Sequence, residues 1–166
     1  MTRADIDIDA TLGHMAETLR AVLARRPLMI GIHTGGVWVA QRLHEKLALA
    51  EPLGSLDISF YRDDFTRVGV NPEVKASSLP VNVDGRHLIL VDDVLHTGRT
   101  IRAALNEIFD YGRPASIVLA VLIERDGREL PIEAQVVGSH MQLAHDAHVK
   151  LLGPTPLTLK LQEAGT

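Results

Sequence analysis

The chain has 166 residues, which suits one domain with a sizeable core, and we expect residues 1–166 to form a single domain. Apolar residues make up 46% and charged residues 23%, and no apolar run is long enough for a membrane span. The absence of cysteine excludes disulfides and thiolate chemistry and favours a cytoplasmic location. The net charge of −4 disfavours a nucleic-acid-binding protein, because such proteins usually carry a basic excess.

The first third of the chain predicts a helix, a strand, a second helix and a second strand. Apolar residues at positions 12, 15, 16, 19, 22 and 23 recur with the spacing of one helix face. Pro27 ends this helix, and Leu28 to Ile32 predicts a short buried strand. His33 to Gly36 predicts a turn, and a helix follows from about Val37 to Leu49. Alternation from Leu56 to Tyr61 then predicts a half-exposed strand.

The rest of the chain begins with a long predicted loop, Asp63 to Val83, and loops of that length are often functional. Leu88 to Val91 predicts an apolar strand that Asp92 and Asp93 interrupt. A helix with an apolar face from Ile101 to Ile108 follows, and Ile117 to Ile123 predicts a central strand. Two later pieces, residues 135–138 and 149–152, are predicted to form strands, and a C-terminal piece follows at residues 157–161.

Strands that alternate with helices predict a fold of the α/β class. Continuous apolar strands are typical of a parallel sheet that is covered by helices on both faces. Ligands of such sheets bind beyond the carboxyl ends of the strands. The glycine-containing turns at residues 33–36 and 94–100 both follow strands, so we expect both at that edge.

The segment LILVDDVLHTGRTIRAAL, residues 88 to 105, carries the main chemical signal. Asp92 and Asp93 would be costly to bury unpaired, which predicts that they face a polar ligand or a cation. Gly98 allows a tight turn, and the start of the following helix favours an anion. The hydroxyls of Thr97 and Thr100 can donate to the same anion. A carboxylate pair beside an anion site fits a ribose 5-phosphate.

This run resembles the motif with which type I phosphoribosyltransferases bind 5-phosphoribosyl-1-pyrophosphate (PRPP): a strand, two acids, a loop that ends in T-G-x-T, and a helix. The resemblance implies a mainly parallel sheet flanked by helices, with a small hood and a flexible active-site loop. It implies that Asp92 and Asp93 hold the ribose hydroxyls. The PRPP-binding residues that it implies, with Leu95 to Thr100 around the 5-phosphate, are Val94, Leu95, His96, Thr97, Gly98, Arg99 and Thr100.

The resemblance extends to the PyrR family, bifunctional regulators of pyrimidine operons that are also uracil phosphoribosyltransferases. The matching pieces cover most of residues 28 to 140: GIHTGGVWVAQRL, LDISFYRDDF, the PRPP motif, YGRPASIVLAVLIERDGRELPI and AQVVGSH. Membership implies that PRPP and uracil give UMP and pyrophosphate, with Mg²⁺ held largely by PRPP, near Asp92 and Asp93. It also implies UMP or UTP as ligands, an mRNA leader as a partner, and a homo-oligomer, dimeric or higher.

Further residues acquire implied roles from the same resemblance. The turn that holds pyrophosphate in the family is K-T-R-G, and here it is His33, Thr34, Gly35 and Gly36, whose backbone amides can still bind pyrophosphate. Arg62, before the loop from Phe65 to Val83, is expected to reach pyrophosphate as part of the catalytic set. Lys75 on that flexible loop is expected to shield the site, and Arg125 to approach the base or pyrophosphate.

The residue at position 96 indicates whether the base is a purine or a pyrimidine. Purine-type members of the superfamily carry a carboxylate at this place, so His96 favours a pyrimidine. A histidine, with an ordinary pKa of roughly 6.5, can also exchange protons near neutrality, which makes His96 a catalytic candidate.

Plainer interpretations stay open beside these. Asp92 and Asp93 can be a solvated strand end, Thr100 a helix cap, and Arg62 part of a solvated charge cluster with Asp63 and Asp64. Two other functions also stay open: an RNA-binding attenuation regulator that senses nucleotide with little catalysis, and a phosphoribosyltransferase for a purine or orotate. The family's basic stretch after Gly138 is missing here, which weakens the RNA interpretation. His140, His145 and His148 lack the spacing of a zinc site.

Overall fold

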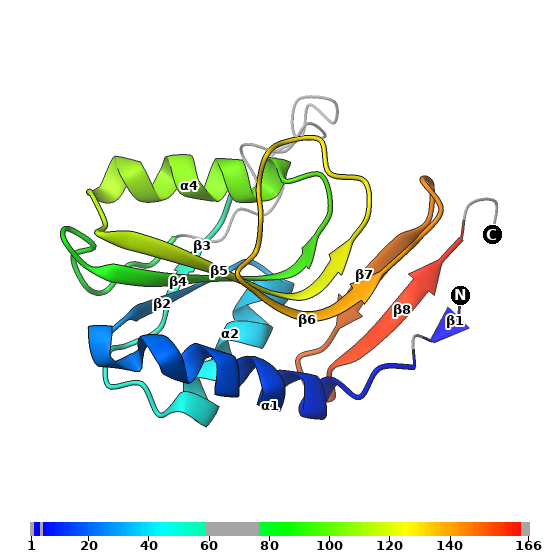
Figure 1. Ribbon diagram of the computed structural model, residues 1–166, viewed down its shortest axis with the longest axis horizontal. Coiled ribbons are helices and arrows are strands. Elements are labelled where there is room, and N and C mark those ends of the chain that lie inside the picture. The colour runs from blue at the N-terminus through cyan, green and yellow to red at the C-terminus, as the bar shows by residue number, and fades with distance from the viewer. Residues whose placement is uncertain (1, 4, 59–76, 164–166) are drawn as a thin grey trace.

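The computed structural model describes residues 2–3, 5–58 and 77–163, and its centre is a five-stranded sheet (Figure 1). The strand order is β3 (Gly54–Leu56), β2 (Leu28–Ile32), β4 (His87–Leu95), β5 (Ser116–Arg125) and β6 (Val136–Met141). Every neighbouring pair in this sheet runs parallel. The prediction of a mainly parallel sheet is confirmed. The run from Ile117 to Ile123 is an interior strand as predicted, although the middle strand is β4.

Helices cover both faces of the sheet. α1 (Ile8–Leu19), which continues into a 3₁₀ helix (Arg20–Arg25), and α2 (Gly35–Leu47) lie on one face, and α4 (Arg99–Tyr111) lies on the other (Figure 1). Alternate residues of β4 serve the two layers: Ile89 and Val91 pack with α1 and α2, whereas Leu88 and Leu90 pack with α4. Because both faces are buried, the strand is a continuous apolar run.

Two predicted elements near the N-terminal end differ in length from the expectation. The α-helix ends at Leu19, and the chain tightens to a 3₁₀ helix before Arg26, whose φ of 51° turns the backbone out of the helix. The strand expected from Leu56 to Tyr61 is the shorter β3, and residues 59–61 lie outside the described residues. Asp57 is buried, where alternation predicted exposure, and its backbone N–H donates to Ser77 Oγ at 3.0 Å.

β4 continues past the acid pair, which the sequence analysis had expected to end it. Val94 and Leu95 still pair with Ile123 and Glu124 of β5. The β4–β5 ladder continues beyond the two carboxylates, and each carboxylate accepts a hydrogen bond from the backbone amide that follows it, at 2.8 Å. The turn predicted at residues 94–100 is therefore wrong in extent, and the connection to α4 is only residues 96–98.

A second, smaller sheet lies beyond β6 at one end of the molecule (Figure 1). It is antiparallel, in the order β1 (Thr2–Arg3), β8 (Thr158–Gln162) and β7 (His148–Leu152). Leu151 and Leu159 point into the core that α1 and α2 share. Lys150 and Lys160 are direct cross-strand partners, and both are exposed. This sheet fits the small hood that the family resemblance implies.

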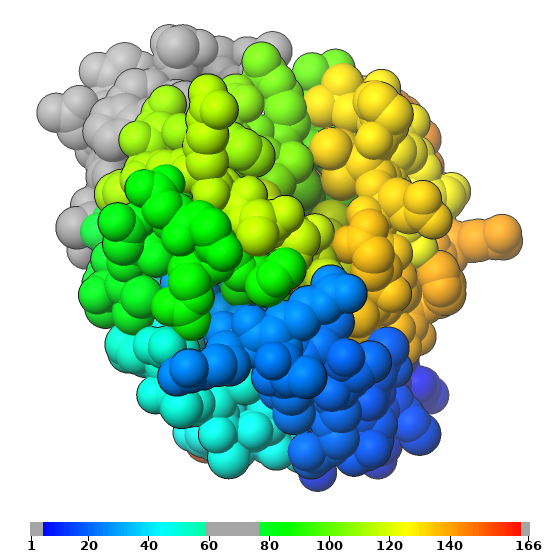
Figure 2. All heavy atoms as spheres, turned by 60° about the vertical axis from the view of Figure 1, so that its left-hand side comes forward, coloured from blue at the N-terminus to red at the C-terminus, as the bar shows by residue number. Residues whose placement is uncertain are grey.

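The amino ends of the parallel strands are closed by polar contacts. Figure 2 turns this end toward the viewer, with the N-terminal helical residues in blue beside the green residues that lead into β4. Arg86 donates to Arg26 O at 2.9 Å and to Glu51 Oε1 at 3.1 Å. The carboxyl ends therefore form the edge that can take a ligand. Within the described part of the chain, no helix is long and apolar enough to cross a bilayer.

Candidate functional site

The acid pair lies at the carboxyl end of β4 and is tightly enclosed. Asp92 is only 5% exposed, and Asp93 is partly buried. Oδ1 of Asp92 accepts from the amide of Asp93, and Oδ1 of Asp93 accepts from the amide of Val94. These bonds fix both carboxylates at the sheet edge. The pair lies near the carboxyl end of an interior strand, which runs two residues further, to Leu95.

The start of α2 rests against this pair. A Cβ on Gly35 would lie 2.8 Å from Cγ of Asp93, and a Cβ on Gly36 would lie 2.8 Å from Val91 O and 3.0 Å from Cα of Asp92. Only glycine permits that approach. The helix begins at Gly35, two residues earlier than expected, so both glycines belong to its first turn.

Residues 33–36 therefore connect β2 to α2 beside the acid pair. His33 N–H donates to Leu56 O at 2.9 Å, and the peptide bond between His33 and Thr34 is cis. Thr34 is the N-cap residue, and its side chain does not cap the helix. The first amides of a helix have no acceptor within that helix, and they carry the positive end of its dipole. The predicted pyrophosphate turn thus has the geometry of an anion site.

The turn before α4 has the same character. Gly98 has a φ of 95°, which favours glycine, and α4 begins at Arg99. The amide of Arg99 donates to Thr97 Oγ1 at 3.2 Å, and the first helical backbone bond from this turn runs from Arg102 N to Gly98 O at 3.0 Å. Thr100 lies between them, in the first turn of the helix, where amides lack helical acceptors. β2 and β4 are neighbours, so the two anion-type helix starts lie at the same edge of the sheet, one on each face (Figure 1).

The connection between β5 and β6 holds this turn in place. Thr97 O accepts from the amides of Glu129 and Leu130 at 2.9 and 3.1 Å. A Cβ on Gly98 would lie 3.1 Å from Ile132 Cγ1, and Arg99 Nε donates to Glu129 Oε1 at 3.0 Å. The turn is therefore braced from outside by a segment some thirty residues away in the chain.

His96 lies between the turn and this segment. A Cβ on Gly127 would lie 2.9 Å from His96 Nε2, so the imidazole covers Gly127. Burial, followed by the nearby charge of Arg125, lowers the pKa of His96 below its ordinary value, and Glu129 opposes this. The ring is therefore neutral at pH 7 and can accept a proton.

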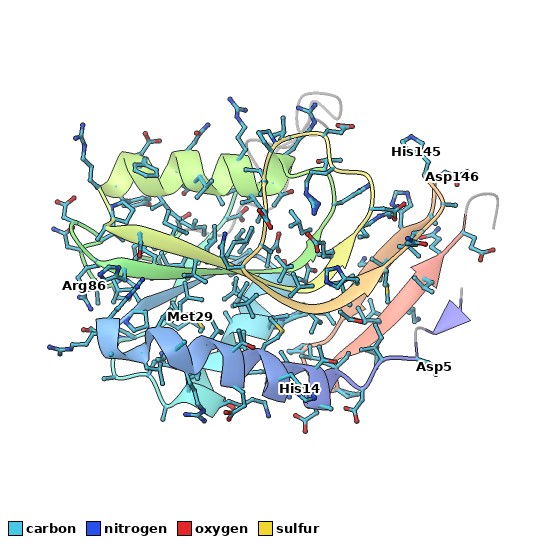
Figure 3. The ribbon with its side chains drawn as sticks, in the orientation of Figure 1. Asp5, His14, Met29, Arg86, His145 and Asp146 are labelled. Atoms are coloured by element: carbon cyan, nitrogen blue, oxygen red, sulfur yellow. The ribbon has the colours of Figure 1, made fainter. Side chains whose placement is uncertain are left out.

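Arg125 is 3% exposed and bound to the segment that leads from β6 to β7. Its NH1 donates to Ala147 O at 2.5 Å and its NH2 to Ala144 O at 3.1 Å, while its Nε has no partner among the described residues. His145 and Asp146 lie between these two alanines in the sequence, and Figure 3 shows them at the outer tip of that segment. Arg125 thus fixes the backbone beside the sheet edge.

A pocket of about 520 Å³ opens at the carboxyl ends of β5 and β6. Its lining includes Glu124, Arg125, Gly127, Arg128 and His140. Glu124 joins two of these side chains, because Oε1 lies 2.6 Å from Arg128 NH2 and Oε2 lies 2.9 Å from His140 Nδ1. The sequence analysis missed Glu124, although a carboxylate near the end of an apolar strand was a usable signal. The pocket adjoins the α4 turn, because Gly127 contacts His96.

Other predicted site residues are not placed by the structure. Arg62 and Lys75 lie outside the described residues, as does most of the predicted loop from Phe65 to Val83. Among the residues that the structure describes, no group of three or more His, Asp and Glu side chains could hold a metal ion.

Comparisons with known proteins identify the family. A phosphoribosyl transferase domain family matches residues 10–150. The bifunctional protein PyrR of Nitrosococcus oceani is 58% identical over 163 residues, which cover 95% of this chain and 92% of that protein. The chain belongs to the PyrR family. Bifunctional protein PyrR of Pseudomonas aeruginosa PAO1 is likewise 58% identical over 153 residues, which cover 90% of each chain.

Solved structures agree with this PyrR fold. A purine phosphoribosyltransferase from Pyrococcus horikoshii superposes with a TM-score of 0.63 at 24% identity, over 81% of this chain and 82% of that one. A hypoxanthine phosphoribosyl transferase from Trypanosoma cruzi gives a TM-score of 0.67 at 19% identity, over 87% and 82%. Both show the type I phosphoribosyltransferase fold, which the sequence predicted.

Proposed function

We propose that the protein is a uracil phosphoribosyltransferase, which converts uracil and PRPP to UMP and pyrophosphate. One observation carries this proposal: the acid pair, two anion-type helix starts and a pocket of about 520 Å³ meet at one sheet edge of a chain of the PyrR family. A ribose with a phosphate on one side, a pyrophosphate on the other and a base beyond them matches that arrangement.

Each part of the site takes one part of PRPP. Asp92 and Asp93 bind the ribose 2- and 3-hydroxyls, and the segment from Val94 to Thr100 binds the 5-phosphate through amides and hydroxyls. The segment from His33 to Gly36 binds pyrophosphate at the start of α2. The bond from ribose C1 to pyrophosphate breaks, and uracil N1 bonds to C1. His96, neutral at pH 7, accepts the proton that N1 loses.

Mg²⁺ is the proposed cofactor. This ion prefers carboxylate and phosphate oxygens, and the acid pair supplies carboxylates next to the PRPP-binding turn, so the residues fit the ion. When bound, largely through PRPP, Mg²⁺ neutralises charge on the departing pyrophosphate. Arg62 and Lys75, which lie outside the described residues, complete the proposed set by binding pyrophosphate and shielding the site. Arg125 supports it by fixing the backbone near the base.

A regulatory role is the second proposed function, because the PyrR relatives are called bifunctional. In this role the site binds UMP or UTP, and the protein recognises an mRNA leader. We further propose a single domain over residues 1–166, a cytoplasmic location and a homo-oligomer, dimeric or higher. Phe109 and Tyr111 on α4 are 57% and 50% exposed, which supports self-association.

One assay tests the catalytic proposal. The protein is incubated with PRPP, Mg²⁺ and each of uracil, orotate, hypoxanthine and adenine, and the nucleotide formed is measured. We expect Mg²⁺-dependent UMP formation from uracil. Product from hypoxanthine with none from uracil would overturn the base assignment.

A further inference from the structure

Glu124 is one of the two acidic residues that line the pocket, with Asp126, and the sheet register fixes the place of Glu124. It pairs with Leu95 of β4 on one side and with His140 of β6 on the other. Its side chain is 18% exposed, so the carboxylate is largely enclosed but still borders the pocket. Leu95 directly precedes His96, so the Glu124 carboxylate lies just beyond the turn before α4 (residues 96–98), on the side away from α2.

Arg128 and His140 hold this carboxylate in one orientation. Arg128 NH2 donates to Oε1, and Arg128 is itself fixed because NH1 donates to His96 O and Nε to Ile132 O, both at 3.0 Å. An ionised carboxylate can only accept, so His140 Nδ1 carries the proton in its 2.9 Å contact with Oε2. Glu124 is thus an immobile acceptor with a remaining lone pair on each oxygen.

Arg128 adds donors next to this acceptor. A guanidinium has five N–H groups, and three of those of Arg128 are used in the bonds above. One N–H on NH1 and one on NH2 remain, the latter on the nitrogen that contacts Glu124, and Arg128 also lines the pocket. The wall therefore presents an acceptor and a donor side by side. Its complement is a ligand with a ring N–H next to a ring carbonyl, the lactam edge of an oxo base.

We propose that Glu124 is the residue that selects the base, by accepting a hydrogen bond from the ring N–H of a lactam edge, and that Arg128 positions it and meets the adjacent carbonyl. This inference rests on the proposed function, because it needs the base in this pocket. Uracil carries N3–H beside C4=O and fits. Cytosine presents a bare N3 lone pair to the carboxylate, which is repulsive, so the site rejects it.

The decisive variant is Glu124→Gln, which keeps the shape and removes the charge. We expect kcat/KM for uracil to fall about 10- to 100-fold, the usual scale for one charge-assisted hydrogen bond. The preference for uracil over cytosine, taken as the ratio of kcat/KM values, should narrow at least about tenfold. The KM for PRPP should stay unchanged, which separates base recognition from general damage. Glu124→Asp should recover part of the preference. Glu133→Gln changes an exposed glutamate in the connection from β5 to β6, is the matched control and should behave as the wild type.

A measurement on the wild type covers the case in which the variant does not fold. 3-Methyluracil lacks the N3–H, so it should compete with uracil at least about tenfold more weakly than 5-fluorouracil does. Equal competition would overturn the role of Glu124, as would an unchanged uracil-to-cytosine ratio in folded Glu124→Gln. No UMP from the wild type would instead overturn the proposed function itself.

Discussion

Gly36→Ala tests whether the start of α2 depends on contact with the acid pair. The added Cβ would lie 2.8 Å from Val91 O, 3.0 Å from Cα of Asp92 and 3.0 Å from its Oδ1. Two of these atoms are backbone atoms of the central strand, which cannot yield as the end of a side chain can. The first turn of α2 must therefore move away from β4 by several tenths of an ångström.

That movement has two expected consequences of different size. Overpacking of this kind costs about 1–3 kcal/mol of the free energy of unfolding. Because PRPP is proposed to span both helix starts, the same shift should lower kcat/KM for PRPP by about tenfold, given how steeply rate depends on placement. The free energy is measured by urea unfolding, and the kinetic constant by UMP formation at saturating uracil.

Gly13→Ala is the matched control. Gly13 lies inside α1, and a Cβ there would have no heavy atom within 4 Å other than its chain neighbours and the backbone of its own helix. An alanine in a helix should therefore stabilise the protein, by about 0.5–1 kcal/mol, without changing the kinetics. If Gly36→Ala unfolded at the wild-type urea midpoint and kept its PRPP kinetics, the contact between α2 and the acid pair would not have the role described.

Four further predictions follow from the site and its surroundings. Asp92→Asn and Asp93→Asn should each impair PRPP use far more than they change the urea midpoint, and normal kinetics in both would remove the acid pair from the mechanism. The pKa of His96 is lowered, so just below pH 6.5 the folded state binds fewer protons than the unfolded state. His96 should therefore make the free energy of unfolding fall as the pH drops through that range. An NMR titration midpoint of His96 at or above roughly 6.5 would contradict this. Lys160→Glu places opposite charges across from Lys150, which should raise the free energy of unfolding by about 0.2–1 kcal/mol at low salt, and a lower urea midpoint would speak against the register. With a net charge of −4, sequence-specific RNA binding should be weak at physiological salt, and tight binding of a pyrimidine-operon leader in a filter assay would show that local charge decides.

Local patterns predicted the parts of this fold whose causes are local. The apolar run before Asp92, the turn glycine at position 98 and the helix after it are encoded within about eighteen residues, and all three elements are present. What sequence reasoning misjudged depends on partners far away in the chain. β4 extends to Leu95 because β5 supplies a ladder there, and α2 starts at Gly35 because the glycines can approach β4.

The same distinction explains the pocket. The pocket's polar cluster comes from β5 (Glu124), β6 (His140) and the segment that connects them (Arg128). Only the parallel register of β5 with β6 brings His140 next to Glu124. No motif joins the three in the sequence. Arg125 lies at the carboxyl end of β5, and its bonds to Ala144 and Ala147 depend on where a later segment runs, which periodicity does not reveal.

The pairing of β1 with β8 has a consequence for how the protein is made. Thr2 is the register partner of Leu161 and Arg3 of Lys160, so the small sheet joins residues separated by nearly the whole chain. During synthesis the five parallel strands, which end at Met141, can associate while the later residues are still in the ribosome. The three-stranded sheet must wait for the last of its strands, and closing so long a loop adds to the delay. A nascent chain would therefore carry the turn before α4 before it carried the hood, and the hood would be the final part to assemble.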